Sequence, residues 1–307
     1  MDLVRAFLPL LLCAAAWGQS PPAQPSELER RLKAAYVDYL KGKAAGSAAA
    51  REVARFYAAH PEADVRFPGP EEFARFYAGP STPPLEQIRA FYDPRLELIV
   101  VPRTGELEGL DGGLPAGEAL QALLRVRAHD ILHESFHALL DKKFGFKVIN
   151  IMEGELLANW REAQFLEAAG RSGAALAAAA ERHLRIEELR RAGRREELAP
   201  LEAAEAADAE KLGPDVLDDA VKVARRRHGP AAFKKGIVAL YGGAGQGMPS
   251  VFADRERVET ALRRELERPG LNNAEREVLL VELSLWSSPE RIAALRRYFR
   301  QAAPELF

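Results

Sequence analysis

Cysteine is almost absent from this sequence, with Cys13 the one example in 307 residues. A single thiol excludes an intramolecular disulfide and a cysteine-rich zinc site, so metal ligands must come from histidine and carboxylate side chains. The 43 basic and 45 acidic residues nearly cancel, to a net charge of −2. Because this balance provides no general attraction for nucleic acid or an anionic membrane, we expect neither as a partner.

Long apolar runs are confined to the N-terminus. Arg5 precedes the apolar stretch 6–16 and a small-x-small site that ends at Gly18, which is typical of a cleaved signal peptide. The run is shorter than the roughly 20 residues that span a bilayer, so we expect no membrane span in the mature chain. Lipidation at Cys13 is disfavoured because the bulky Leu12 precedes it. We therefore expect a secreted or periplasmic protein.

Composition divides the chain into four parts. We expect a signal peptide at 1–18, a proline-rich linker at 19–26, a core at 27–170 and a helical C-terminal region at 171–307. Apolar periodicity predicts two helices within 27–59, then helices over 116–143 and 150–169, and further helical stretches over 174–210, 214–228, 254–268 and 273–302. The glycines at 242–247 lack the Lys-Ser/Thr of a phosphate loop and favour a flexible connection.

A short β-branched stretch at 96–101 is bounded by Pro94 and Pro102 and predicts a strand. We expect it in a small sheet whose edge binds an extended peptide by strand addition. The fold class is therefore predicted to be mainly α (α+β), with a small β-sheet and an extended C-terminal helical region.

The long helix predicted over 116–143 contains the pentad His133-Glu134-Ser135-Phe136-His137. A spacing of four places His133 and His137 on one helical face, one turn apart, where two imidazoles can bind one zinc ion. Glu134 is then placed to act as a general base on a nearby water. Because this helix is apolar over most of its circumference, burying these polar groups without an ion would be costly, which favours a metal.

A catalytic zinc ion usually has three protein ligands, so a third must be found. No histidine lies between His137 and His183, which directs attention to Glu153 and Glu155 on the following predicted helix. These two glutamates point about 200° apart, so only one can face the metal. We favour Glu155, because the small Ala158 on its face permits close helix packing, and keep Glu153 as the alternative.

The stretch 129–165 resembles the gluzincin metallopeptidases, in which a His-Glu-x-x-His helix precedes a helix with a glutamate ligand. Glu155-Leu156-Leu157-Ala158-Asn159 is similar to their Glu-x-x-x-Asp signature, with Asn159 replacing the aspartate that orients a histidine ligand. Glu153-Gly154 is similar to the opening of the aminopeptidase-like branch, which would make Glu153 the ligand. The resemblance implies a zincin-like catalytic core.

The resemblance also implies a secreted zinc metallopeptidase that acts on peptide or protein substrates. His133, His137 and Glu155 would hold Zn²⁺, and Glu134 would take a proton from the attacking water and deliver it to the leaving amine. The alternative is a non-catalytic secreted binding or scaffold protein with a degenerate zinc site. The intact Glu134 favours the enzyme.

Three further side chains are candidates for supporting roles. His129 lies one turn before His133, but three successive turns do not easily surround one ion, which favours a hydrogen-bonded histidine outside the ligand set. Gluzincins also use a Tyr or His to stabilise the oxyanion. Tyr241 and His228 are the downstream candidates, and that role stays unassigned.

Overall fold

The computed structural model describes residues 24–76, 84–94, 96–108, 110, 113–148, 151–170, 173–241, 248–271 and 273–307. The predicted signal peptide, most of the linker and the glycines at 242–247 lie outside these residues. Within the described part, no helix combines the length and apolar character needed to cross a bilayer.

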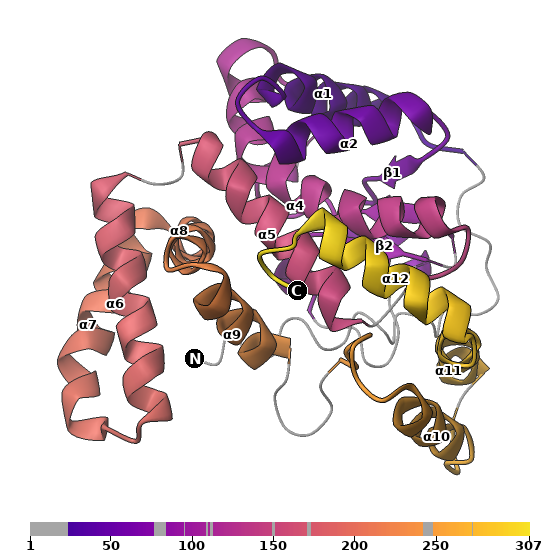
Figure 1. The fold of residues 1–307 in the computed structure, drawn as a ribbon. Coiled ribbons are helices and arrows are strands. Elements are labelled where there is room, and N and C mark those ends of the chain that lie inside the picture. Colours follow the sequence, from indigo (N-terminus) through magenta and orange to yellow (C-terminus); the bar gives the residue numbers. More distant parts are fainter. Residues whose placement is uncertain are drawn as a thin grey trace.

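The described chain is mainly helical with one small sheet, which confirms the predicted fold class. Its α-helices are α1 (Glu27–Lys43), α2 (Ala48–Ala59), α3 (Pro70–Phe76), α4 (Gly117–Phe144), α5 (Met152–Ala168), α6 (Ala174–Arg191), α7 (Leu198–Leu212), α8 (Pro214–Arg227), α9 (Pro230–Tyr241), α10 (Arg255–Leu266), α11 (Asn273–Trp286) and α12 (Pro289–Ala302). Helices α4 and α5 lie in the middle, between α1–α2 and the C-terminal helices (Figure 1).

Helix α4 carries the histidine motif well inside its 28 residues. It ends at Phe144, where Gly145 adopts a left-handed backbone with φ of 64° that glycine tolerates without a Cβ penalty. Helices α3 and α9 were not predicted. In α9 the central Gly236 weakens the helical pattern, yet it is needed there because a Cβ would lie 2.8 Å from the side chain of Arg225.

The sheet contains β1 (Asp64–Arg66), β2 (Phe91–Asp93) and β3 (Leu98–Val100), in the order β1-β3-β2. Strand β3 lies within the predicted stretch 96–101 and pairs parallel to β1 and antiparallel to β2. Because β3 is central, both of its edges are paired, and the edges of the sheet belong to β1 and β2. Strand β3 packs against α4, with Ile99 in the same cluster as Leu132. Strand β2 makes a hydrogen bond to the motif itself, through the backbone N–H of Tyr92.

Two hydrophobic clusters hold the α4–α5 pair from opposite sides. The first joins α1, α2 and the sheet to these helices and includes Tyr36, Val53, Ile99, Leu132 and Phe165. The second joins them to α9, α11 and α12 and includes Leu140, Trp160, Phe233, Trp286 and Phe299. The C-terminal helices therefore share a core with α5, and this packing sets the spacing between the two helices that carry the predicted ligands.

Candidate metal centre

The three predicted ligands meet between α4 and α5. The Nε2 atoms of His133 and His137 lie 3.3 Å apart. The Glu155 carboxylate lies 3.5 Å from Nε2 of His133 through Oε2, and 3.4 Å from Nε2 of His137 through Oε1. All three side chains keep a small exposure of 12–16%. The structure thus places two imidazole nitrogens and a carboxylate around one point that solvent can reach.

These distances fit a bound zinc ion. Tetrahedral zinc with ligand bonds of about 2.0–2.1 Å separates its ligand atoms by about 3.3 Å, close to the spacing seen here. The Oε2 atom of Glu155 is buried and accepts no hydrogen bond of good geometry within the described residues. A group of two imidazoles and one carboxylate is a donor set that zinc prefers. The residues present therefore fit the metal that the sequence predicts.

Glu153 does not face this point. Its carboxylate accepts hydrogen bonds from the Ser250 hydroxyl and, at 2.8 Å, from the backbone N–H of Val251. It therefore anchors the segment before α10 to the start of α5. Of the two glutamates that the sequence left open, the structure brings Glu155 to the histidines and places Glu153 in a structural role.

Glu134 lies beside the ligands but outside their group. Its Oε2 accepts a hydrogen bond of 2.8 Å from the backbone N–H of Tyr92 on β2. Burial raises the pKa of Glu134 to about 7, against the opposing effect of His133. The strand edge thus fixes one carboxylate oxygen.

The three predicted ligand side chains differ in pKa. Burial lowers the pKa of His137 to about 4, so this imidazole is neutral near pH 7. Burial also opposes ionisation of Glu155, but the neighbouring His137 and His133 hold its pKa at about 2. Burial opposes protonation of His133 as well, yet the neighbouring carboxylates of Glu155 and Glu162 raise its pKa. At neutral pH the site therefore contains an ionised carboxylate beside a neutral imidazole.

Glu162 on α5 is a site residue whose role the sequence did not reveal. It is 1% exposed, and its Oε2 lies 3.0 Å from Nδ1 of His133. Once it has lost its Nε2 proton, a His133 that donates from Nδ1 would present the Nε2 lone pair to the predicted metal position. Burial opposes ionisation of Glu162, but Lys222, with Nζ 2.6 Å from Oε1, holds its pKa well below the usual range. The sequence feature that could have indicated Glu162 is its position two turns after Glu155, on the same face of the helix.

His129 belongs to the hydrogen-bonded network behind the ligands. It is fully buried, and its Nδ1 lies 2.9 Å from Oε1 of Glu162. Its Nε2 lies 3.4 Å from Asp219 and 3.0 Å from the guanidinium of Arg89. His129, Glu162 and Asp219 are close enough to bind an ion, but the cations of Arg89 and Lys222 already occupy their surroundings. His129 is therefore a hydrogen-bonded histidine outside the predicted ligand group, which is the role that its spacing on the helix favoured.

Asn159 does not orient a histidine. Its Nδ2 donates to the backbone oxygen of Glu155 at 2.9 Å and to the Tyr241 hydroxyl at 3.4 Å. Because that hydroxyl accepts from Asn159, its own proton is directed to the Glu155 carboxylate, with which it also interacts. Tyr241 thus contacts the predicted ligand Glu155 from the end of α9. His228 pairs instead with Glu181, at 2.7 Å.

In comparisons with known proteins, the chain matches no family model, no curated protein and no solved structure. The gluzincin resemblance therefore stays a prediction, and the site is argued from its own residues.

Replacing Glu162 with glutamine is expected to weaken zinc binding about 10–100-fold, because the amide carries no charge to hold the His133 tautomer. Competition with a chromogenic chelator measures the dissociation constant. Glu167→Gln is the matched control, since Glu167 lies on the same helix but pairs with Arg226 and Arg227 on the surface. Equal zinc affinity in Glu162→Gln and the wild type would remove Glu162 from the site.

Proposed function

We propose that this protein is a secreted or periplasmic zinc-dependent hydrolase that cleaves peptide bonds. The observation that supports this most is the meeting of His133, His137 and Glu155 at the ligand spacing of tetrahedral zinc, with Glu134 adjacent. The choice of peptides as substrates rests on the gluzincin resemblance.

His133, His137 and Glu155 would hold the zinc ion. When bound, zinc polarises a carbonyl and lowers the pKa of a coordinated water. The chain's own residues set the position of this chemistry, because Glu162 orients His133 while Tyr241 and Asn159 contact Glu155 or its backbone. The residues that contact His133 and Glu155 or hold Glu162 lie on α5, α8 and α9. Both the predicted core and the C-terminal helices therefore contribute to the site.

Glu134 is the general base in this proposal. The Tyr92 N–H holds its Oε2, which leaves Oε1 to receive a proton from the attacking water. The same oxygen then returns the proton to the departing amine, so the carboxylate ends in its starting state. Because the strand edge fixes the carboxylate, little reorganisation is needed between the two transfers.

Removal of the metal is expected to abolish cleavage of casein. Dipicolinate, which chelates zinc, should stop the reaction, and added zinc should restore it. Isophthalate places its two carboxylates similarly but lacks the ring nitrogen, so it serves as the non-chelating control. Cleavage that continues after zinc has been removed would contradict the proposal. Zinc binding without turnover of any unfolded protein would favour the non-catalytic binding protein.

A further inference from the structure

The chain at the start of β2 contacts helix α4 at two points. The backbone N–H of Tyr92 donates to Oε2 of Glu134 at 2.8 Å. Three residues earlier, Nε of Arg89 lies 3.2 Å from the Asp130 carboxylate, with which it forms an ion pair. Asp130 and Glu134 are four residues apart on α4 and therefore lie on one face of that helix, one turn apart. The hydrogen bond to the proposed base thus has a charged contact one turn before it.

The Arg89 guanidinium contacts three partners through separate nitrogens. Besides the bond from Nε to Asp130, its Nη2 lies 3.0 Å from Nε2 of His129, and its Nη1 lies 3.6 Å from Asp215 at the start of α8. The side chain is 23% exposed. A guanidinium is planar and rigid, so it cannot move away from one partner without disturbing the others. Arg89 therefore ties the backbone just before β2 to both α4 and α8.

Strand β2 is short and lies at the edge of the sheet. It has three residues, and in the order β1-β3-β2 it pairs with β3 alone. A three-residue edge strand has few ladder hydrogen bonds to hold it in place. The distance between the Tyr92 N–H and Glu134 therefore depends on contacts that tie the strand to α4, and the pair of Arg89 and Asp130 is such a contact.

Asp130 keeps a cation when Arg89 is replaced. Nη1 of Arg127 lies 3.7 Å from the Asp130 carboxylate, and Nη2 of the same arginine donates to the backbone oxygen of Thr104 at 3.0 Å. Loss of Arg89 would therefore not leave a buried carboxylate without a partner, which is the strongly destabilising case. Variants of Arg89 should fold, and their effects report on the position of β2.

From the two contacts and the shortness of β2, we infer that Arg89 is a positioning residue for Glu134. It holds the start of β2 against α4, which keeps the Tyr92 N–H on Oε2 and leaves Oε1 to the attacking water. Arg89 acts through Asp130 and Tyr92 and takes no part in the proton transfer. The catalytic consequence rests on the proposed function, whereas the contact between β2 and α4 does not.

Hydrogen exchange of the Tyr92 amide tests this contact without any need for turnover. Methionine keeps the length of the side chain but cannot pair with Asp130, so we expect the Tyr92 amide to exchange at least about tenfold faster in Arg89→Met. The Val101 amide donates to the backbone oxygen of Arg66 at 2.8 Å and should exchange at the wild-type rate, which shows that the sheet is intact. A Tyr92 amide as protected as in the wild type would overturn the inference.

The division of the effect between kcat and KM gives the second readout. A small misplacement of a reacting group can cost about 10²-fold, so Arg89→Met is expected to lower kcat for casein about 10–100-fold. KM should stay within about twofold, because substrate binding does not depend on the base, and the zinc content should be unchanged. Arg89→Lys keeps one cation for Asp130 and should restore part of kcat and part of the Tyr92 protection.

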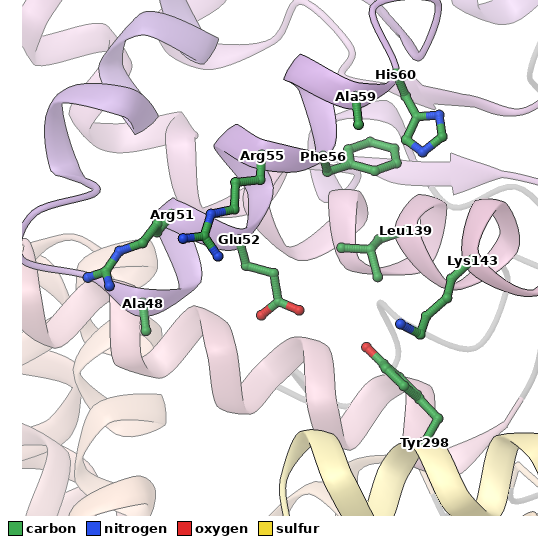
Figure 2. Close-up of a pocket in the computed structure, with 10 residues that line it drawn as sticks. All are labelled: Ala48, Arg51, Glu52, Arg55, Phe56, Ala59, His60, Leu139, Lys143 and Tyr298. Carbon is green, nitrogen blue, oxygen red and sulfur yellow. The ribbon is translucent and has the colours of Figure 1, made fainter.

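Arg55→Met is the matched control. Arg55 is exposed and lines a pocket of about 540 Å³ where α2 faces α4 and α12 (Figure 2). Leu139 in that lining is two residues from His137 and points about 200° away from it, so the pocket and the metal centre lie on different faces of α4. This variant should match the wild type in amide exchange and in kcat.

The two readouts also separate this inference from the proposed function. A wild-type protein without turnover would reject the proposed function, and the Tyr92 amide would still decide whether Arg89 holds β2 on α4. In an active protein, a released Tyr92 amide with unchanged kcat would contradict the positioning role. A lowered kcat with full Tyr92 protection would contradict it as well, because Arg89 would then act by another route.

Discussion

Glu134→Gln is expected to reduce peptide hydrolysis about 10²–10⁴-fold while leaving bound zinc unchanged. Glutamine keeps the size of the side chain and an oxygen that can accept from the Tyr92 N–H, which is 2.8 Å from Oε2 in the native protein. It cannot take a proton from water at neutral pH. Turnover of casein, compared with zinc content in the same preparation, measures both parts of the prediction.

The combination of results decides the role of Glu134. Lost activity with zinc retained is the pattern of a base that does not bind the metal. Lost zinc would make Glu134 part of the ligand set, and full activity in Glu134→Gln would exclude it as the base. Glu108→Gln is a surface control, since Glu108 is exposed and lies outside the site.

Glu155→Gln is expected to weaken zinc binding by more than the 10–100-fold typical of a residue that only supports a ligand. The amide removes the charge of a carboxylate that lies within 3.5 Å of both imidazoles. Glu153→Gln is a matched control two residues away. Its new amide keeps an oxygen to accept from Val251, so the segment before α10 should remain in place.

Zinc affinity measured in parallel separates the two glutamates that the sequence could not. A large loss in Glu155→Gln with little change in Glu153→Gln is the expected pair of results. The reverse pair would assign the ligand to Glu153 and contradict the geometry of the site. Circular dichroism of both variants verifies that the helices are intact.

Much of the helical framework was predictable from periodicity, because α4 and α5 have long apolar patterns and clear ends. The structure begins α4 at Gly117 and ends it at Phe144, close to the predicted 116–143. Short elements escaped prediction for a physical reason. Strand β2 has three residues and α9 contains Gly236, so neither has enough regular pattern to stand out without its packing partners.

The shared face of His133 and His137 was predictable from their spacing of four, and the small Ala158 favoured Glu155 as their partner without excluding Glu153. The supporting residues were not predictable. Lys222 reaches Glu162 from 60 residues away, and Tyr241 reaches Asn159 from 82 residues away. Such pairs depend on how α8 and α9 pack against α5, and the local pattern of either helix contains no information about that packing.

The zinc content of the wild-type protein tests the central claim most directly. After exposure to zinc and dialysis against zinc-free buffer, elemental analysis is expected to find about one zinc ion per chain, held by the site between α4 and α5. A wild-type chain that retains no zinc after this treatment would contradict the account, because the spacing of His133, His137 and Glu155 would then have another cause.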